Sequence, residues 1–187
     1  MFYYDTRNEM VKNLIDLNSS ICEFGTFEGS FIPFLLECNP KKITCVDLWD
    51  GIKSSGDENG NNLRKVDLNV AHTNLLKKYE NDKRLLFIKD STLQASKNIL
   101  IDGEFDCVYI DADHSYGGVK LDLDIAKKIV KKGGWIMGHD YEINKEKCLY
   151  NYTFGVKRAV DEFCLKHNLS IYAKAKDGCV SYEIKNL

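Results

Sequence analysis

A short glycine-containing turn is the first segment of this chain whose residues could do chemistry. The stretch ICEFGTFEGSF (21–31) places Glu23, Gly25 and Gly29 at the end of an apolar run. The two glycines allow a sharp turn and a close approach of a ligand to the backbone, and a following helix offers free N–H groups. A pyrophosphate would accept those N–H groups, but the carboxylate of Glu23 would repel it. The turn therefore disfavours NAD and favours a ligand with an ammonium and a sulfonium, S-adenosylmethionine.

Further polar positions lie where the other parts of such a ligand would bind. Asp47 follows the turn by about 20 residues, the interval at which a carboxylate accepts both hydroxyls of a ribose. Asp90 and Ser91 end a later apolar run and could reach an adenine edge. A second interpretation of this pair stays open, because both residue types also cap helices. The expected cofactor contacts are Glu23, Gly25, Gly29, Asp47, Asp90 and Ser91.

The elements that must position these residues alternate between strand and helix. Short apolar runs predict five buried strands, at 20–24, 42–47, 85–90, 105–111 and 133–138. The clearest helical spacing between them is that of Val119, Leu123, Ala126 and Val130. This alternation predicts right-handed crossovers and a mostly parallel sheet with helices on both faces.

The last part of the chain follows a different pattern. An amphipathic helix around 156–164 precedes two apolar runs, LSIYAKA and CVSYEI, with the turn KDG between them. These runs predict a hairpin, which brings the total to a seven-strand mixed sheet. We expect one domain over residues 1–187, with 1–19 as a short N-terminal helical extension. The polar segment 49–65 is expected to be a mobile loop.

Composition narrows the class of partner and the compartment. The chain has 26 Lys and Arg against 28 Asp and Glu, so no basic excess favours binding to nucleic acid or to a membrane surface. A small molecule is the expected partner. The seven cysteines include no C-x-x-C pair and mostly lie in apolar runs, as buried free thiols do. With neither a signal peptide nor a long apolar run in view, the expected location is cytoplasmic.

Residues 105–141 contain two motifs that resemble a known enzyme family. The motifs are DADHSY (111–116) and GHDY (138–141), and VDLWDG (46–51) and FGVKRAVDEF (154–163) accompany them. Together they resemble the class I S-adenosylmethionine-dependent methyltransferases, and among these the small O-methyltransferase-like group. The resemblance covers about 20–184. It implies a Rossmann-like doubly wound sheet of order 3-2-1-4-5-7-6, with strand seven antiparallel.

The same resemblance implies positions for a metal ion. In metal-dependent relatives an acid after strand four ligates a divalent cation, and that position corresponds to Asp111. The next ligand follows strand five, which corresponds to Asp140. Those relatives continue with an asparagine where this chain has Tyr141, so the resemblance does not supply a third ligand.

Two arrangements stay open at this acceptor end. In the first, Asp111 and Asp140 with His139 or His114 bind Mg²⁺ or a similar cation, which lowers the pKa of the acceptor hydroxyl. In the second there is no metal, and His114 or His139 removes the proton while an aspartate orients the ring. A structural alternative is that Asp113 and His114 cap a helix and that His139 packs with Tyr141.

The expected function is transfer of a methyl group from S-adenosylmethionine to a hydroxyl of a small molecule or a sugar. The alternative is an S-adenosylmethionine-binding module without turnover that supports a partner enzyme. The 19 residues before the first predicted strand are few for a cap over the acceptor. The acceptor pocket is therefore expected to be shallow, closed by loops, or shared across a homodimer.

Overall fold

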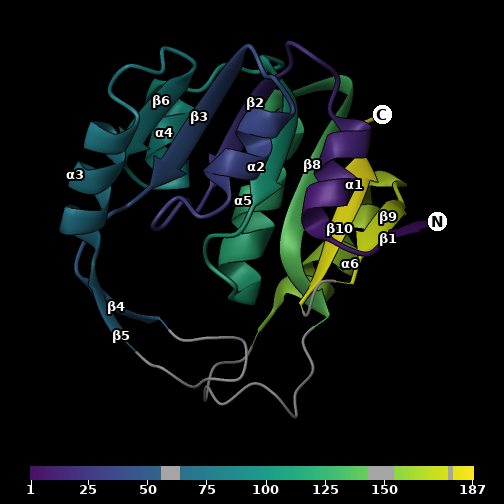
Figure 1. Ribbon diagram of the computed structural model, residues 1–187. Helices are drawn as coiled ribbons and strands as arrows, with labels where there is room; N and C mark the ends of the chain where they lie inside the picture. Colours follow the sequence, from purple (N-terminus) through teal and green to yellow (C-terminus); the bar gives the residue numbers. More distant parts are fainter. Residues whose placement is uncertain (56–63, 143–153, 177–178) are drawn as a thin grey trace.

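The computed structural model is built on one large sheet, described here over residues 1–55, 64–142, 154–176 and 179–187 (Figure 1). Its strands are β1 Phe2–Tyr4, β2 Ser20–Phe24, β3 Lys42–Asp47, β6 Leu85–Lys89, β7 Phe105–Ile110, β8 Val130–Glu142, β9 Ile171–Ala175 and β10 Val180–Lys185. They lie in the order β1-β9-β10-β8-β7-β2-β3-β6. Strands β2, β3, β6, β7 and β8 are parallel neighbours, whereas β10 is antiparallel to β8 and β9.

This topology confirms the predicted sheet with one addition. When β1 is left out and the sheet is followed from its other edge, the strands lie in the order β6-β3-β2-β7-β8-β10-β9, which is the expected order 3-2-1-4-5-7-6. The strand that was expected to be antiparallel, strand seven, is β10. The predicted count of seven strands is wrong, because β1 pairs in parallel with β9 at the edge of the sheet. The sequence predicts residues 2–4 to be part of a helical extension, but their Phe-Tyr-Tyr sequence favours a strand wherever a sheet edge is open.

Six helices of the described chain cover the two faces of the sheet. They are α1 Arg7–Leu14, α2 Ile32–Glu37, α3 Leu68–Lys78, α4 Thr92–Asn98, α5 Tyr116–Ile129 and α6 Val156–His167. One apolar cluster joins the sheet to α1, α2 and α3, and a second joins the opposite face to α4, α5 and α6 (Figure 1). Among the described residues, no helix combines the length and the apolar character needed to cross a bilayer.

The predicted helical spacing in α5 is confirmed for three of its four residues. Val119, Leu123 and Ala126 are buried in the helix, whereas Val130 already begins β8. The C-terminal hairpin is confirmed as β9 and β10, although its residues 177–178 lie outside the described part. The described cysteines are free thiols, buried at Cys22, Cys38, Cys45, Cys107 and Cys164 and half-buried at Cys179.

Strand β8 is longer than predicted and is irregular at its carboxyl end. It spans Val130–Glu142 rather than 133–138. On β10, Tyr182 lies opposite Gly138 and Val180 lies opposite Glu142, so four steps on β8 match two steps on β10. The extra residues form a β-bulge that contains His139 and Asp140. Bulges of this kind redirect side chains and are common beside active sites.

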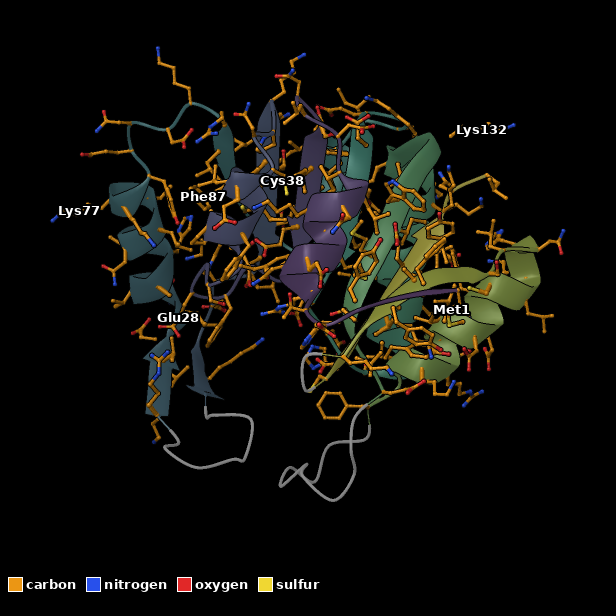
Figure 2. The ribbon with its side chains drawn as sticks, turned by 45° about the vertical axis from the view of Figure 1, so that its right-hand side comes forward. Met1, Glu28, Cys38, Lys77, Phe87 and Lys132 are labelled. Carbon is orange, nitrogen blue, oxygen red and sulfur yellow. The ribbon has the colours of Figure 1, made fainter. Side chains whose placement is uncertain are left out.

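The prediction of a loop over 49–65 is wrong for 52–55 and 64–65, which form strands, whereas 49–51 lie in neither a helix nor a strand. Strand β4, Ile52–Ser55, pairs antiparallel with β5, Arg64–Asp67, and residues 56–63 lie outside the described part. Figure 1 draws this pair below α3, apart from the large sheet. Arg64 of β5 donates a hydrogen bond to Glu28 Oε1 at 3.0 Å, which connects the pair to the turn after β2 (Glu28 is labelled in Figure 2). Of β5 only Val66 is buried, so the strand lacks the apolar alternation by which strands are predicted.

A buried carboxyl group in β10 has no hydrogen-bond partner in the part of the chain that the structure describes. Glu183 is 0% exposed, and neither of its side-chain oxygens finds a partner within the described residues. Burial raises the pKa of Glu183 from its ordinary value near 4.5 to about 8, and Lys185 opposes the shift. The folded chain therefore holds a proton that the unfolded chain has already lost between these two pH values. The contribution of Glu183 to the free energy of unfolding is full below about pH 4.5 and is lost as the pH rises toward 8.

Replacing Glu183 by glutamine is expected to remove this loss of stability. Each pKa unit corresponds to about 1.4 kcal/mol, so the variant should gain roughly 2 to 4 kcal/mol on the parent between pH 4.5 and 8.5. Urea unfolding at several pH values measures the difference. Glu80→Gln, at an exposed position after α3, is the control and should show no such gain. A difference between Glu183→Gln and the parent that is constant with pH would contradict the assignment.

Candidate active site

The turn after β2 contains a position that only glycine can occupy. Gly25 has φ +86°, and its N–H donates to the Val46 carbonyl at 2.9 Å. A Cβ at Gly25 would lie 2.1 Å from the carbonyl oxygen of Asp111. The predicted cofactor turn therefore packs directly on the backbone of the predicted acceptor end.

Gly29 serves a different contact. A Cβ there would lie 2.5 Å from the Leu75 side chain of α3, and the Gly29 N–H donates to the Thr26 carbonyl at 2.7 Å. The missing side chain allows the turn to pack against α3. The observed contact of Gly29 is thus with a helix.

Glu23 lies beneath the turn. The residue is 2% exposed, and its Oε2 accepts a hydrogen bond from the Thr26 hydroxyl at 2.7 Å. Burial raises the pKa of Glu23 to about 7, against the opposing effect of the Thr26 hydrogen bond. Near neutral pH the carboxyl group is therefore only partly ionised. A cationic ligand above the turn would lower this pKa and favour the charged form.

Asp47, the predicted ribose-binding acid, is held in place by two backbone groups. Its Oδ2 accepts the Phe27 N–H at 2.8 Å and its Oδ1 accepts the Trp49 N–H at 2.9 Å. Each carboxylate oxygen has a further lone pair, and the residue is only half-buried. The group is fixed in position and can still accept two hydroxyls. These features fit a ribose.

Asp90 lies next to Asp47, whereas Ser91 caps a helix. The Asp90 N–H donates to the Asp47 carbonyl at 3.0 Å. The Ser91 hydroxyl accepts the Gln94 N–H at 3.2 Å as the N-cap of α4, and the Ser91 N–H donates to Asp90 Oδ1 at 2.7 Å. The Ser91 hydroxyl therefore caps a helix, as the second interpretation of this pair predicted. Asp47 and Asp90 remain together at the ends of β3 and β6.

Four ionisable side chains meet where β7 and β8 end. His114 Nε2 lies 3.2 Å from Asp111 Oδ1 and 3.2 Å from Asp140 Oδ2. His139 Nδ1 lies 3.3 Å from Asp140 Oδ1 and 4.0 Å from Asp111 Oδ2. Asp140 is the most buried of them, with its side chain 9% exposed. The structure therefore brings together all the predicted catalytic and metal-ligating residues.

The irregular end of β8 explains how two successive residues reach the same site. In a regular strand, neighbouring side chains point to opposite faces of the sheet. Asp140 instead has φ +59°, in the left-handed region, and lies within the bulge. As a result, His139 and Asp140 both contact the cluster. Aspartate tolerates this conformation better than most residues do.

The charges of the cluster shift the pKa values of its members. Burial by itself lowers the pKa of His114, but the hydrogen bond to Asp111 and the charges of Asp140 and Asp111 outweigh it, so the pKa is raised. Burial also acts to lower the pKa of His139, but the hydrogen bond to Asp140 and the charges of the nearby carboxylates outweigh it, so this pKa is raised as well. Burial raises the pKa of Asp140, but His139 and His114 lower it overall. The carboxylates therefore favour positive charge between them.

Part of the cluster also fits a metal ion. Asp111, His139 and Asp140 each offer a ligand atom, and these three atoms lie within 4.8 Å of one another. Two carboxylates and one imidazole suit Mg²⁺ or Mn²⁺, which favour oxygen ligands and retain water. The position predicted to differ, Tyr141, takes no part in this group. Its hydroxyl donates to Asp161 in α6 at 2.6 Å.

Asp113 lies outside the cluster of four. It is exposed, and its carboxylate accepts the Ser115 N–H at 2.8 Å and the Ser115 hydroxyl at 2.9 Å. Ser115 is the N-cap of α5. Asp113 therefore has a structural role at the start of α5. His114 instead contacts two carboxylates and stacks on Phe154, with ring centroids 5.1 Å apart.

Arg7 is a member of the site that the sequence did not predict. It is the first residue of α1, and its Nη1 lies 3.4 Å from Asp111 Oδ2. The two residues are 104 positions apart. No local spacing could indicate this contact, because it depends on where α1 packs on the sheet.

Comparisons with known proteins identify a family and a fold. A family model described as a methyltransferase domain matches residues 22–141. An uncharacterized protein of Acanthamoeba polyphaga mimivirus is 30% identical over 122 residues, which are 64% of this chain and 50% of that protein. The match thus spans about half the length of that relative.

Solved structures resemble this one throughout the chain. A SAM-dependent methyltransferase from Aquifex aeolicus has a TM-score of 0.64 at 13% identity, over 98% of this chain and 91% of that chain. Aeropyrum pernix fibrillarin, in complex with natively bound S-adenosyl-L-methionine, has a TM-score of 0.62 at 13% identity, over 95% and 72%. At such identities the likeness shows a common fold.

Proposed function

The chain belongs to the family of methyltransferase domains, and from this premise we propose that it transfers a methyl group from S-adenosylmethionine to a hydroxyl of a small molecule or a sugar. The observation that carries the proposal is the cluster of Asp111, His114, His139 and Asp140. It lies against the Gly25 turn, so a donor held by the turn and an acceptor held by the cluster would be neighbours.

The cofactor would be held at the ends of β2, β3 and β6. S-adenosylmethionine supplies an electrophilic methyl group, and the enzyme's task is to align an acceptor lone pair with it. Gly25 leaves room for close approach, and Asp47 presents two carboxylate oxygens fixed by backbone N–H groups. Glu23, beneath the turn, supplies a carboxyl group that a nearby positive charge would ionise.

The acceptor would be held at the ends of β7 and β8. Asp111, Asp140 and His139 are the residues that would hold a divalent cation there, with His114 beside them. Such a cation would lower the pKa of a bound hydroxyl as a Lewis acid. In the arrangement without metal, His139 or His114 removes the proton, and Asp140 and Asp111 orient the imidazole rings.

Two titrations and one screen test this function. Calorimetry should show binding of S-adenosylhomocysteine, with NAD failing to compete at comparable concentrations. The titration is repeated with Mg²⁺ and followed by a screen of hydroxyl-bearing acceptors for methylated products. Absence of S-adenosylhomocysteine binding would contradict the proposal. Binding without turnover of any acceptor would favour the binding module.

Replacing Asp47 by alanine is expected to weaken S-adenosylhomocysteine binding about tenfold to a hundredfold, because a carboxylate that accepts two ribose hydroxyls is lost. Calorimetric titration measures the change. Asp67→Ala is a matched control, because Asp67 also accepts two backbone N–H groups, from Asn69 and Val70, but as the cap of α3. The control should bind like the parent. Equal affinity in Asp47→Ala would show that the ribose binds elsewhere.

A further inference from the structure

Arg7 brings a positive charge to the cluster from the far end of the sequence. Its guanidinium lies 4.7 Å from the centre of the Phe31 ring. Its Nη1 is 3.4 Å from Asp111 Oδ2, and the Arg7 side chain is 23% exposed. An aromatic face and a carboxylate therefore orient the group.

The helix that carries Arg7 is firmly packed. Met10 and Val11 of α1 are 0% and 1% exposed, and the Thr6 hydroxyl caps the helix by accepting the Glu9 N–H at 3.1 Å. The backbone of Arg7 is therefore fixed close to the cluster.

Asp111 can therefore interact with two positive charges, the Arg7 guanidinium and a bound metal ion. It belongs to the three residues that could hold a metal ion, and its Oδ2 already lies opposite Arg7 Nη1. A cation on this carboxylate would repel the guanidinium, and it would gain less from a carboxylate whose charge is already partly compensated.

We infer that Arg7 is a positioning residue that compensates Asp111 and sets the affinity of the site for a divalent cation by competing for that carboxylate. The inference rests on the cation arrangement of the proposed function. It differs from a purely structural role, in which Arg7 only ties α1 to β7. A structural tie would affect stability but would not make cation binding tighter when it is removed.

The test is Mn²⁺ binding, followed by the electron paramagnetic resonance signal of the free ion. Arg7→Gln should bind Mn²⁺ about tenfold more tightly than the parent, because one repelling charge is gone. Arg7→Lys keeps the charge and should remain within about threefold of the parent. Lys12→Gln is the control, because Lys12 lies on the same helix in an exposed pair with Glu37 at 3.6 Å. It should bind like the parent.

The outcomes separate this inference from the cation arrangement on which it rests; the transfer of a methyl group itself is tested separately, by the acceptor screen. Equal or weaker Mn²⁺ binding in Arg7→Gln, with clear binding in the parent, overturns the role of Arg7 and leaves the cation site standing. No Mn²⁺ binding in any variant overturns both. Arg7→Met, which retains an apolar contact with Phe31, is measured alongside in case the glutamine variant is unstable, and the same tightening is expected.

Discussion

Replacing Asp140 by asparagine is expected to lower kcat/KM by about 10² to 10⁴, since a positioned acid–base group or a metal ligand contributes on that scale. Asp140 contacts His139 at 3.3 Å and His114 at 3.2 Å, and its side chain is 9% exposed. Asparagine keeps the size and tolerates the left-handed conformation, but it removes the charge. Initial rates with an acceptor from the screen measure the effect.

The matched control is Asp113→Asn, the same chemical change two residues beyond Asp111. Asp113 accepts hydrogen bonds from Ser115 at the start of α5, and asparagine serves this position about as well. The control should therefore keep its rate within about threefold. Both variants should retain S-adenosylhomocysteine affinity, because the Asp47 end is untouched. Full activity in Asp140→Asn would remove this residue from either arrangement.

Chelation decides between the two arrangements at the acceptor end. If a cation is held by Asp111, His139 and Asp140, EDTA should lower activity to the level of Asp140→Asn, and Mg²⁺ or Mn²⁺ should restore it. S-adenosylhomocysteine binding should survive the treatment. A preparation free of metal that turns over at the full rate would contradict the cation and leave His114 or His139 as the base.

The meeting of these side chains was predictable because of the parallel sheet. Asp111 ends one apolar run and Asp140 lies just after another, the two runs were predicted as neighbouring strands, and parallel strands end at one edge of a sheet. The sequence predicted that His139 and Asp140 reach this site, but it could not show how two successive residues of a strand point to the same cluster. That depends on the bulge opposite β10 and on φ +59° at Asp140, which arise from tertiary pairing rather than from local spacing.

Other members of the site depended on packing that the sequence does not encode locally. Glu23 was predicted from its charge at the end of a strand, but the fold buries it and raises its pKa to about 7. Arg7 was not predicted, because the docking of α1 decides its place. The strand pair β4 and β5 was missed because nearly all its described side chains are exposed.

The contact between the turn and Asp111 leads to the largest expected loss of stability, that of Gly25→Ala. A side chain at φ +86° is strained by about 1 to 2 kcal/mol. The added Cβ would also lie 2.1 Å from a backbone oxygen, which cannot rotate away as the end of a side chain can. Overpacking of this kind typically costs about 1 to 3 kcal/mol more. We therefore expect Gly25→Ala to lose roughly 2 to 5 kcal/mol in urea unfolding.

Gly51→Ala separates the two causes of that loss. Gly51 has φ +77°, but a Cβ there would meet nothing within 4 Å. It should therefore lose only about 1 to 2 kcal/mol, the cost of the left-handed conformation alone. If the two variants lost equal stability, the overlap with Asp111 would not exist in solution. If Gly25→Ala loses more stability than Gly51→Ala, the structure must relieve the overlap by moving Asp111 away from the turn. Activity should then fall further than S-adenosylhomocysteine affinity does.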